Sequence, residues 1–358
     1  MRVAIDARHL GQGRGIARYL EEMLAALAAS FPTDEWVAVV PGDRDVSVPP
    51  GVELRRTRLA SKPLFAAAVI AGRPRLEKLA GGADVCWLPA PAPVACGRRT
   101  PYVLTIHDLS FEIAEEDFTA YERRWHRLAR PRRLAEHAAA IVVDSEATRQ
   151  ALVDAEWPVD TDAATVVRAA PSSRVSGAGK RHESDGRYLL YVGALEPRKG
   201  IDTLAEAIVI ARRIGLTAPL LVVGEGRLGA QLETLAGVKL LGRQSDEQLA
   251  ELYGGALALV MPSTLEGFGL PPVEAATHGV VSVTSDLPVF HETLGDALIT
   301  FPAGDAQALA KALVLAAGDA KLRAKLGSAA QLAAASLTWP SAAQALHQVL
   351  SSAAKDRQ

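Results

Sequence analysis

The sequence predicts an α/β protein of two domains, each built on a parallel sheet. Its length of 358 residues is more than one hydrophobic core usually holds. Each half opens with a short apolar strand that runs into a glycine-containing loop and then a helix, first at Val3–Ala7 and again at Tyr188–Val192. Small and polar residues at 171–186 separate the halves as a linker would. This pattern is typical of Rossmann-like domains, which we expect at 1–170 and 187–336.

The composition is that of a globular protein, with 49% apolar and 22% charged residues. A formal net charge of −2 argues against a dedicated nucleic-acid binder, which normally carries a basic excess. Cys86 and Cys96 are too few for a disulfide framework, which favours a reducing compartment. The sequence shows no signal-peptide pattern and no window of about 18 uninterrupted apolar residues. We therefore expect a cytoplasmic protein without a membrane span.

The first half continues with alternating helices and strands. The loop Leu10–Gly15 leads into a helix at Ile16–Ala29, whose apolar residues follow helical spacing. As a dinucleotide fingerprint this loop lacks its third glycine, so it is a weak signal for such a cofactor. His107 and Asp108 follow one of the later strands, at the sheet edge where open α/β sheets bind ligands. Those strands are expected at Trp36–Val40, Val85–Leu88, Tyr102–Ile106 and Ala139–Asp144.

The second half repeats the alternation of strands and helices. Arg198 and Lys199 lie in the loop after its first strand, where solvent exposure is the ordinary explanation for a basic pair. The C-terminal part is expected to form one alanine-rich helix over Ala306–Leu332 and a last helix over Ser341–Ser352. Further strands are expected at Leu220–Val223, Val238–Leu241, Ala256–Pro262 and Val280–Thr284.

The stretch Ser263–Glu274, S-T-L-E-G-F-G-L-P-P-V-E, joins a buried strand to a helix through a glycine loop. Gly267 and Gly269 let backbone N–H groups approach an anion, and the helix N-terminus adds its positive dipole. Glu266 and Glu274 bring carboxylates that can accept hydrogen bonds from a neutral polyol beside that anion. From this loop alone, a sugar-nucleotide site and an ordinary strand-to-helix turn are about equally well supported.

The same stretch resembles a known signature, the E-x7-E motif of retaining GT-B glycosyltransferases of family 4. Its usual form, E-G-F-G-L-P-x-x-E, matches this sequence at every fixed position from Glu266 to Glu274. The segment G-A-L-E-P-R-K-G, which begins at Gly193, is similar to the G-x-x-x-x-R-K-G loop of that family. The resemblance implies a GT-B fold, with a C-terminal helix at 337–358 that crosses back to the N-terminal domain.

Two N-terminal segments carry a weaker part of the resemblance. Gly15 to Tyr19 is similar to the G-I-G-R-Y loop of the family, with Ala17 in place of a glycine. The segment T-I-H-D-L-S-F around His107 resembles a branch that makes bacterial polysaccharides, in which the histidine faces the donor sugar. The resemblance covers nearly the whole chain and is strongest from Tyr188 to Glu292.

The resemblance also implies roles for individual residues. The basic pair after the first strand of the second half would hold the donor diphosphate in place of a metal ion, so neither a metal nor a cofactor is expected. The expected catalytic residues are His107, Arg198, Lys199 and Glu266. The expected donor-binding residues are Gly15, Gly193, Arg243, Leu249, Phe268, Gly269, Leu270 and Glu274, and the acceptor-side residues are Asp108 and Tyr19.

These segments look most like mannosyl- and related deoxysugar-transferases, so GDP-mannose is the first expected donor, ahead of UDP- and dTDP-sugars. A glycan or lipid-linked molecule is the expected acceptor. Three other functions stay open at this point. They are a sugar-nucleotide 2-epimerase of similar fold, a non-catalytic hinged sugar-binding protein, and an NAD-linked oxidoreductase that rests only on the imperfect N-terminal glycine loop.

The segment Tyr121–Glu136 holds six arginines and two glutamates. A solvated helix face is the usual explanation for such a run of charge. The alternative is a basic patch that contacts anionic lipid through Arg123, Arg124 and Arg127, with Tyr121 and Trp125 as interfacial aromatic residues. The sequence leaves both interpretations open.

Overall fold

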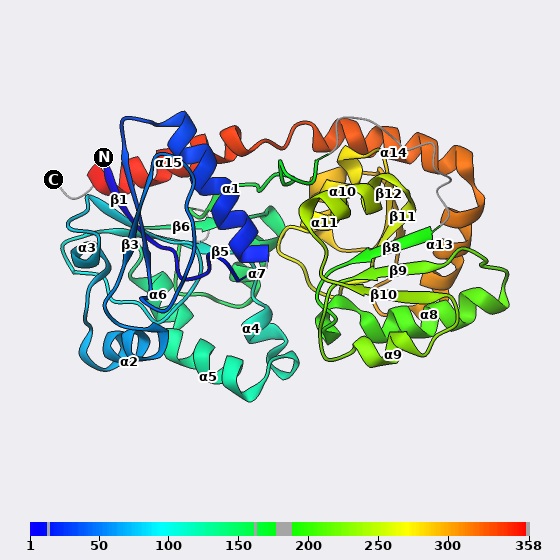
Figure 1. Cartoon of the computed structure of the whole chain (residues 1–358), viewed down its shortest axis with the longest axis horizontal. Helices are drawn as coiled ribbons and strands as arrows, with labels where there is room; N and C mark the ends of the chain where they lie inside the picture. The colour runs from blue at the N-terminus through cyan, green and yellow to red at the C-terminus, as the bar shows by residue number, and fades with distance from the viewer. Residues whose placement is uncertain (13–14, 161–162, 177–187, 356–358) are drawn as a thin grey trace. The chain divides into compact units, whose positions relative to one another are not determined.

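The computed structural model describes residues 1–12, 15–160, 163–176 and 188–355. The chain divides into two compact units, each of which is described by itself below. Unit 1 consists of Met1–Ala169 together with Thr338–Gln358, and unit 2 consists of Ala170–Leu337 (Figure 1). The prediction of an α/β protein with two Rossmann-like domains is confirmed, since each unit contains its own parallel sheet.

The sheet of unit 1 has seven strands in the order β3-β2-β1-β4-β5-β6-β7, and all its neighbouring strands run parallel. The order reverses between β1 and β4, as it does in a Rossmann sheet, and ligands bind at such a reversal beyond the carboxyl ends of the strands. The strands are β1 (Arg2–Asp6), β2 (Glu35–Val40), β3 (Val52–Arg56), β4 (Val85–Leu88), β5 (Tyr102–Ile106), β6 (Ala140–Val143) and β7 (Thr165–Val166).

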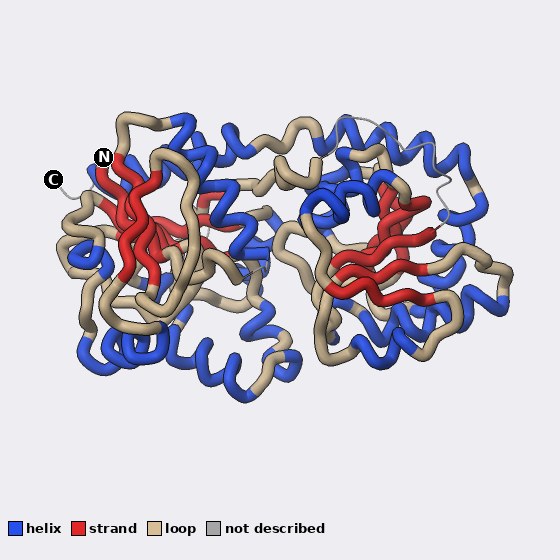
Figure 2. Tube along the Cα trace, viewed as in Figure 1, coloured by secondary structure: helices blue, strands red, loops and turns tan. Residues whose placement is uncertain are grey.

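Helices pack on both faces of this sheet (Figure 2). On one face α1 (Gly15–Ser30) contacts α15 (Trp339–Lys355), which also contacts β4, β5 and β6. On the other face α3, α6 and α7 contribute to a separate apolar core. The remaining elements of this unit are α2 (Ser61–Ala71), α3 (Leu76–Leu79), α4 (Ser110–Ile113), η1 (Glu115–Asp117), α5 (Ala120–Ala129), α6 (Pro131–Glu136) and α7 (Glu146–Asp154).

The sheet of unit 2 has six parallel strands in the order β10-β9-β8-β11-β12-β13, which repeats the Rossmann order. Its reversal lies between β8 and β11. The strands are β8 (Tyr188–Val192), β9 (Leu220–Val223), β10 (Val238–Gly242), β11 (Ala256–Met261), β12 (Val281–Ser285) and β13 (Leu298–Phe301). The helices are η2 (Pro197–Lys199), α8 (Ile201–Arg213), α9 (Gly229–Glu233), α10 (Asp246–Gly254), α11 (Leu270–Thr277), α12 (Pro288–Leu294), α13 (Ala306–Gly318) and α14 (Ala320–Ala334).

Two helical segments differ from the sequence-based expectation. The helix expected over Ala306–Leu332 is two helices, because the side chain of Asp319 accepts a hydrogen bond from the N–H of Leu322 at 2.8 Å and so caps a new helix. The basic segment is also two helices. Its break is at Arg130, which adopts a left-handed φ of 49° immediately before Pro131.

The expected linker at 171–186 lies partly outside the described residues, as do residues 13 and 14 of the N-terminal glycine loop. The described part of the linker is not wholly solvated, since Val175 is fully buried in the core of unit 2 and Ser172 is 1% exposed, whereas Ser173 and Arg174 are exposed. Across the described ranges, no helix combines the length and the apolar character that crossing a bilayer requires.

The helix α15 is far from unit 1 along the chain but belongs to its core. Leu346 and Leu350 are fully buried, and His347 stacks on the ring of Phe31 with 3.6 Å between centroids. Nε2 of His347 also lies 2.7 Å from a carboxylate oxygen of Asp34. Both apolar and polar contacts therefore hold α15 on unit 1.

We predict that Leu346→Ala lowers the free energy of unfolding of unit 1 by about 2–5 kcal/mol, because it removes buried methyl groups and leaves a cavity. Urea unfolding followed by circular dichroism measures this change. The control is Gln348→Ala, whose side chain is exposed on the same helix. Equal stability of the two variants would contradict the buried position of Leu346.

Candidate functional site

The two central strands of unit 2, β8 and β11, lie side by side and end at the same edge of the sheet. The loop after β8 carries Arg198 and Lys199, and the loop after β11 carries Glu266. These two strands flank the reversal of strand order, which is where a ligand binds in open α/β sheets. The topology therefore brings together two segments that lie more than sixty residues apart in sequence.

An ion pair joins the two loops. Nζ of Lys199 lies 2.6 Å from Oε1 of Glu266, and the Ser263 hydroxyl donates to the same oxygen at 2.7 Å. The Lys199 and Glu266 side chains are only 13% and 8% exposed. Because removing a charge from water is costly, this close pairing of opposite charges offsets part of the cost of burying both side chains.

Backbone contacts hold the same loops at a fixed separation. The carbonyl of Arg198 accepts hydrogen bonds from the N–H of Thr264 at 2.9 Å and from its hydroxyl at 3.2 Å. Gly200 has a φ of 69°, and a Cβ atom there would lie 1.9 Å from the carbonyl oxygen of Pro262. Only glycine fits at this position, so the basic residues are held close to the acidic loop.

The glycine loop presents unused backbone donors. Gly269 has a φ of 81° and precedes the first residue of α11, and Pro271 and Pro272 occupy the first turn of that helix. In the described parts of the chain, no hydrogen bond uses the N–H groups of Phe268, Gly269 or Leu270. Free N–H groups at a helix N-terminus favour an anion.

Glu274 lies in the second turn of α11. Its side chain accepts a hydrogen bond from the Tyr253 hydroxyl at 2.9 Å, and both residues are buried. His278 supports Tyr253 from the next turn, with its ring stacked at 5.8 Å and its Nε2 2.8 Å from the carbonyl of Val175. Burial lowers the pKa of His278, so this histidine is neutral and structural.

The other expected donor-binding residues of unit 2 lie in different environments. Gly193 donates its N–H to the carbonyl of Val223 at 3.0 Å, directly after β8. Arg243 forms an exposed ion pair with Glu225 at 3.2 Å. Leu249 is 6% exposed, and its side chain belongs to the apolar core of unit 2.

The expected residues of unit 1 gather at the carboxyl edge of its sheet. His107 follows β5, and its Nδ1 lies 2.5 Å from a carboxylate oxygen of Asp144, which follows β6. Tyr19 is 2% exposed and packs its ring against that of His107, so it is buried in this structure. Asp108 accepts hydrogen bonds from the N–H and hydroxyl of Ser110, and Gly15 begins α1.

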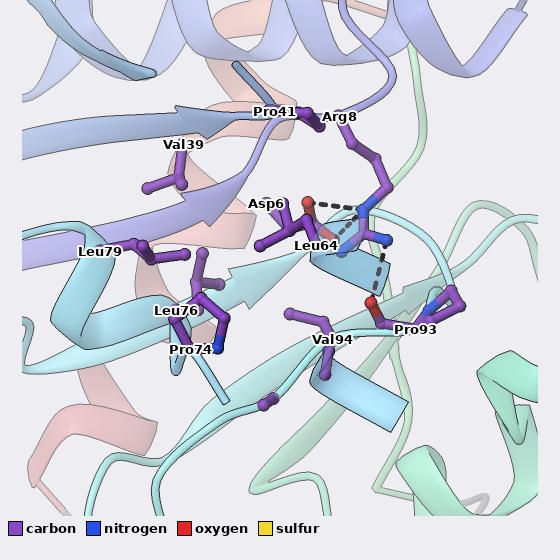
Figure 3. A pocket seen from close by; sticks show the side chains of 12 residues that line it. Asp6, Arg8, Val39, Pro41, Leu64, Pro74, Leu76, Leu79, Pro93 and Val94 are labelled. Atoms are coloured by element: carbon purple, nitrogen blue, oxygen red, sulfur yellow. Dashed lines mark hydrogen bonds and ion pairs between the residues drawn. The ribbon is translucent and has the colours of Figure 1, made fainter. Parts of the chain in front are cut away.

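A cavity at the same edge lies beside β1 and β2 (Figure 3). Its polar part is the buried pair of Arg8 and Asp6, in which Nε of Arg8 donates to Asp6 at 2.8 Å and Nη1 to the carbonyl of Pro93 at 3.1 Å. The guanidinium lies 4.4 Å from the centroid of the Phe65 ring. Sequence reasoning missed this pair and also missed Asp144, although each follows or ends an apolar strand that it identified.

Two family models match the chain. The model described as "Glycosyltransferase Family 4" matches residues 13–168, and the one described as "Glycosyl transferases group 1" matches residues 177–333. Together they account for nearly all of both units.

Known proteins also resemble the chain. O-antigen chain mannosyltransferase B of Escherichia coli is 36% identical over 131 residues, which are 34% of each chain. The O-antigen chain mannosyltransferase RfbU of Salmonella typhimurium is 35% identical over 116 residues, 30% of this chain and 32% of the relative. The matches thus span about a third of the length of these curated relatives.

A solved structure extends the likeness of fold over the whole chain. The structure of HepE from Anabaena, in complex with UDP and glucose, has a TM-score of 0.74 and 19% identity, and the match covers 98% of this chain and 100% of that one. This likeness of fold agrees with the two Rossmann-like units described above, each of which contains one parallel sheet. This chain belongs to the glycosyltransferases of GT-B fold that resemble family 4.

Proposed function

We propose that this protein is a retaining glycosyltransferase, which moves a sugar from a nucleoside-diphosphate donor to a glycan or lipid-linked acceptor. The observation that carries the proposal is the buried pair of Lys199 and Glu266, which lies at the strand-order reversal of unit 2. The loop that holds Glu266 also holds the three unused N–H groups of residues 268–270. Cationic and amide donors suit a diphosphate, and a carboxylate beside them suits sugar hydroxyls.

The diphosphate is the group that gains charge in the reaction. As the bond between sugar and phosphate breaks, negative charge grows on the leaving phosphate, and prearranged donors stabilise that state more than the bound donor. Lys199 supplies a point charge and Arg198 a planar guanidinium. Within the described residues, the Arg198 guanidinium forms no ion pair or hydrogen bond, so it is available to a phosphate. These groups take the part that a metal ion plays elsewhere, and the proposed reaction uses no cofactor.

Two carboxylates recognise the carbohydrate parts of the donor. Glu266, which already pairs with Lys199, would accept hydrogen bonds from hydroxyls of the transferred sugar. Glu274 would accept one from the ribose, with Tyr253 holding it in place. His107 of unit 1 would face the donor sugar, and Asp108 would lie on the acceptor side. Retention would follow from attack on the face that the phosphate leaves, with that phosphate accepting the proton of the acceptor.

Mannose from GDP-mannose is the first donor to test, because the two curated relatives described above are mannosyltransferases. UDP-sugars are the second, because the structurally similar HepE was solved with UDP and glucose. The base would lie near Arg243, whose side chain is 60% exposed and free to change its partner.

We predict that Lys199→Met lowers kcat by about 100- to 1,000-fold, the loss expected when one charge-stabilising donor is removed. The same change leaves Glu266 buried without its cation and therefore lowers stability. The double variant Lys199→Met/Glu266→Gln removes both charges, so it should recover stability and remain inactive. Sugar transfer and thermal unfolding are measured on the same preparations.

The matched control is Lys239→Met, which changes an exposed lysine of the same unit. It should leave transfer and stability unchanged. A Lys199→Met variant with normal turnover would remove the ion pair from the mechanism.

We predict that one nucleoside diphosphate stabilises the protein selectively. A ligand present at 100 times its dissociation constant adds about 2.7 kcal/mol to the folded state. Thermal unfolding with GDP, UDP, dTDP and ADP at equal concentrations measures the choice of base. Stabilisation by GDP alone would support a GDP-sugar donor. Equal shifts with all four would contradict a specific base site, and no shift with any of them would contradict the donor site.

We also propose that α5 contacts an anionic membrane surface. Tyr121 and Leu128, at 65% and 42% exposure, lie on one face of the helix with the exposed Arg124. Arg127 is exposed nearby and pairs with Glu115 of η1. Not all of the expected contact residues are free to take part. Trp125 packs against the ring of Phe65 at 4.7 Å, and Arg123 donates to the carbonyl of Phe118.

We predict that Arg124→Glu/Arg127→Glu reduces binding to phosphatidylserine vesicles by at least about tenfold at low salt, since each basic residue contributes about 1 kcal/mol near such a surface. Co-sedimentation measures the binding. The control is Lys239→Glu/Lys321→Glu, an equal change of charge on the exposed surface of unit 2. Equal binding of both variants would contradict a contact through α5.

A further inference from the structure

The carboxyl ends of β5 and β6 lie in register. Ile106 pairs with Val143 across the two parallel strands, and each is the last residue of its strand. The next residue of each chain segment, His107 and Asp144, therefore leaves the sheet beside the other. This register explains the distance of 2.5 Å between Nδ1 of His107 and Oδ2 of Asp144.

The junction between β6 and α7 holds His107 at a second point. Ser145 caps α7 by accepting a hydrogen bond from the N–H of Thr148 at 3.0 Å. The hydroxyl of Thr148 in turn donates to the backbone carbonyl of His107 at 3.1 Å. One short segment thus fixes both the main chain and the imidazole of His107.

Apolar packing alone does not favour a carboxylate at position 144. Its side chain is 6% exposed, and its second carboxylate oxygen has no hydrogen-bond partner among the described residues. A buried carboxylate is costly unless a positive charge and hydrogen bonds compensate it. The nearby N-terminus of α7 and the His107 ring are the compensation that the structure provides.

The surroundings favour the charged form of His107. Burial pushes the pKa of this histidine down, but the charge and hydrogen bond of Asp144 raise it, and the charge of Asp108 and the backbone of Pro89 add to the rise, so that the net direction is upward. His9, in the loop after β1, also interacts with His107, but burial lowers the pKa of His9 to about 4. His9 is therefore neutral where His107 is charged, and it does not repel the imidazolium.

Aromatic contacts keep the imidazole in one orientation. The Tyr19 ring meets it edge-on at 4.8 Å, and the ring of Trp339, the first residue of α15, lies 5.7 Å from that of Tyr19. With Nδ1 engaged by Asp144, the other ring nitrogen, Nε2, is buried, and the backbone of Pro89 lies near the ring. That nitrogen is a donor when His107 is charged.

We infer that Asp144 is a positioning residue for transfer, which holds the imidazole of His107 in one orientation. The inference rests on the proposed function, because it assigns Asp144 a part in the same reaction. Asp144 acts only through the imidazole of His107.

The test has one readout that needs no catalysis and one that does. In Asp144→Asn the ring of His107, followed by NMR and assigned with His107→Gln, should titrate at least about one pH unit lower, because a neighbouring carboxylate raises such a pKa by about 1–3 units. The kcat of the same variant should fall by about 100-fold, the effect of a misplaced reacting group, with the KM for the donor nearly unchanged. Asp144→Glu keeps the carboxylate charge and should therefore retain part of the raised titration of His107 and part of the kcat.

Two comparisons separate positioning from a purely structural role. In the His107→Gln background, Asp144→Asn should have no further effect on kcat, since both changes remove the same interaction. The exposed Asp154→Asn at the end of α7 is the control, and it should change neither the titration nor the rate.

An unchanged titration of His107 in Asp144→Asn would overturn the inference, and so would a normal kcat in a variant whose titration has shifted. Failure of the proposed function looks different. In that case the wild-type protein transfers no sugar from any nucleoside-diphosphate donor, and any part for Asp144 in transfer fails with it. The titration then still decides whether Asp144 charges His107.

Discussion

A charged lysine that is mostly shielded from water is far less costly when a carboxylate lies beside it, and unit 2 brings these two groups together. Lys199 comes from the loop after β8 and Glu266 from the loop after β11, and the two strands are neighbours only because the strand order reverses between them. Gly200 allows the first loop to approach the backbone of Pro262, since any side chain there would collide with its carbonyl. Topology, glycine and charge thus act together at one edge of the sheet. Their result is a cation paired with a carboxylate of the loop that leads into α11.

Unit 1 repeats the strand order of unit 2 but places different chemistry at its edge. Where unit 2 presents a lysine, a glutamate and open amide groups, unit 1 buries histidines and carboxylates among aromatic rings. The two units therefore divide the work of the proposed reaction. In that reaction unit 2 would bind the anion, while unit 1 would supply groups whose charge depends on their neighbours. The common fold explains where these residues gather, and the individual side chains explain what they do.

Much of the fold and part of the candidate site could be predicted from the sequence, because apolar strands and glycine loops are recognisable from local sequence patterns. The strand before His107 and the strand before Asp144 were both visible, yet their register was not, so the pair was missed. Lys199 and Glu266 were predicted as ligands for parts of one donor, whereas their contact with each other depends on which strands are neighbours. Tyr253 lies 21 residues before Glu274, and no local pattern joins them. The short edge strand β3 was also missed, since none of its residues is buried and charged residues break its apolar run.

The place of α15 has a consequence for how the protein is made. Unit 1 contains both the first strand and the last helix of the sequence, and all of unit 2 is synthesised between them. During synthesis on the ribosome, the apolar surface that α15 covers stays exposed until unit 2 and then α15 have been synthesised. Unit 2 can fold as one continuous segment, whereas the core of unit 1 is complete only after α15 has been synthesised. During that interval the exposed apolar surface can bind chaperones. A nascent chain arrested before residue 339 would keep this surface exposed.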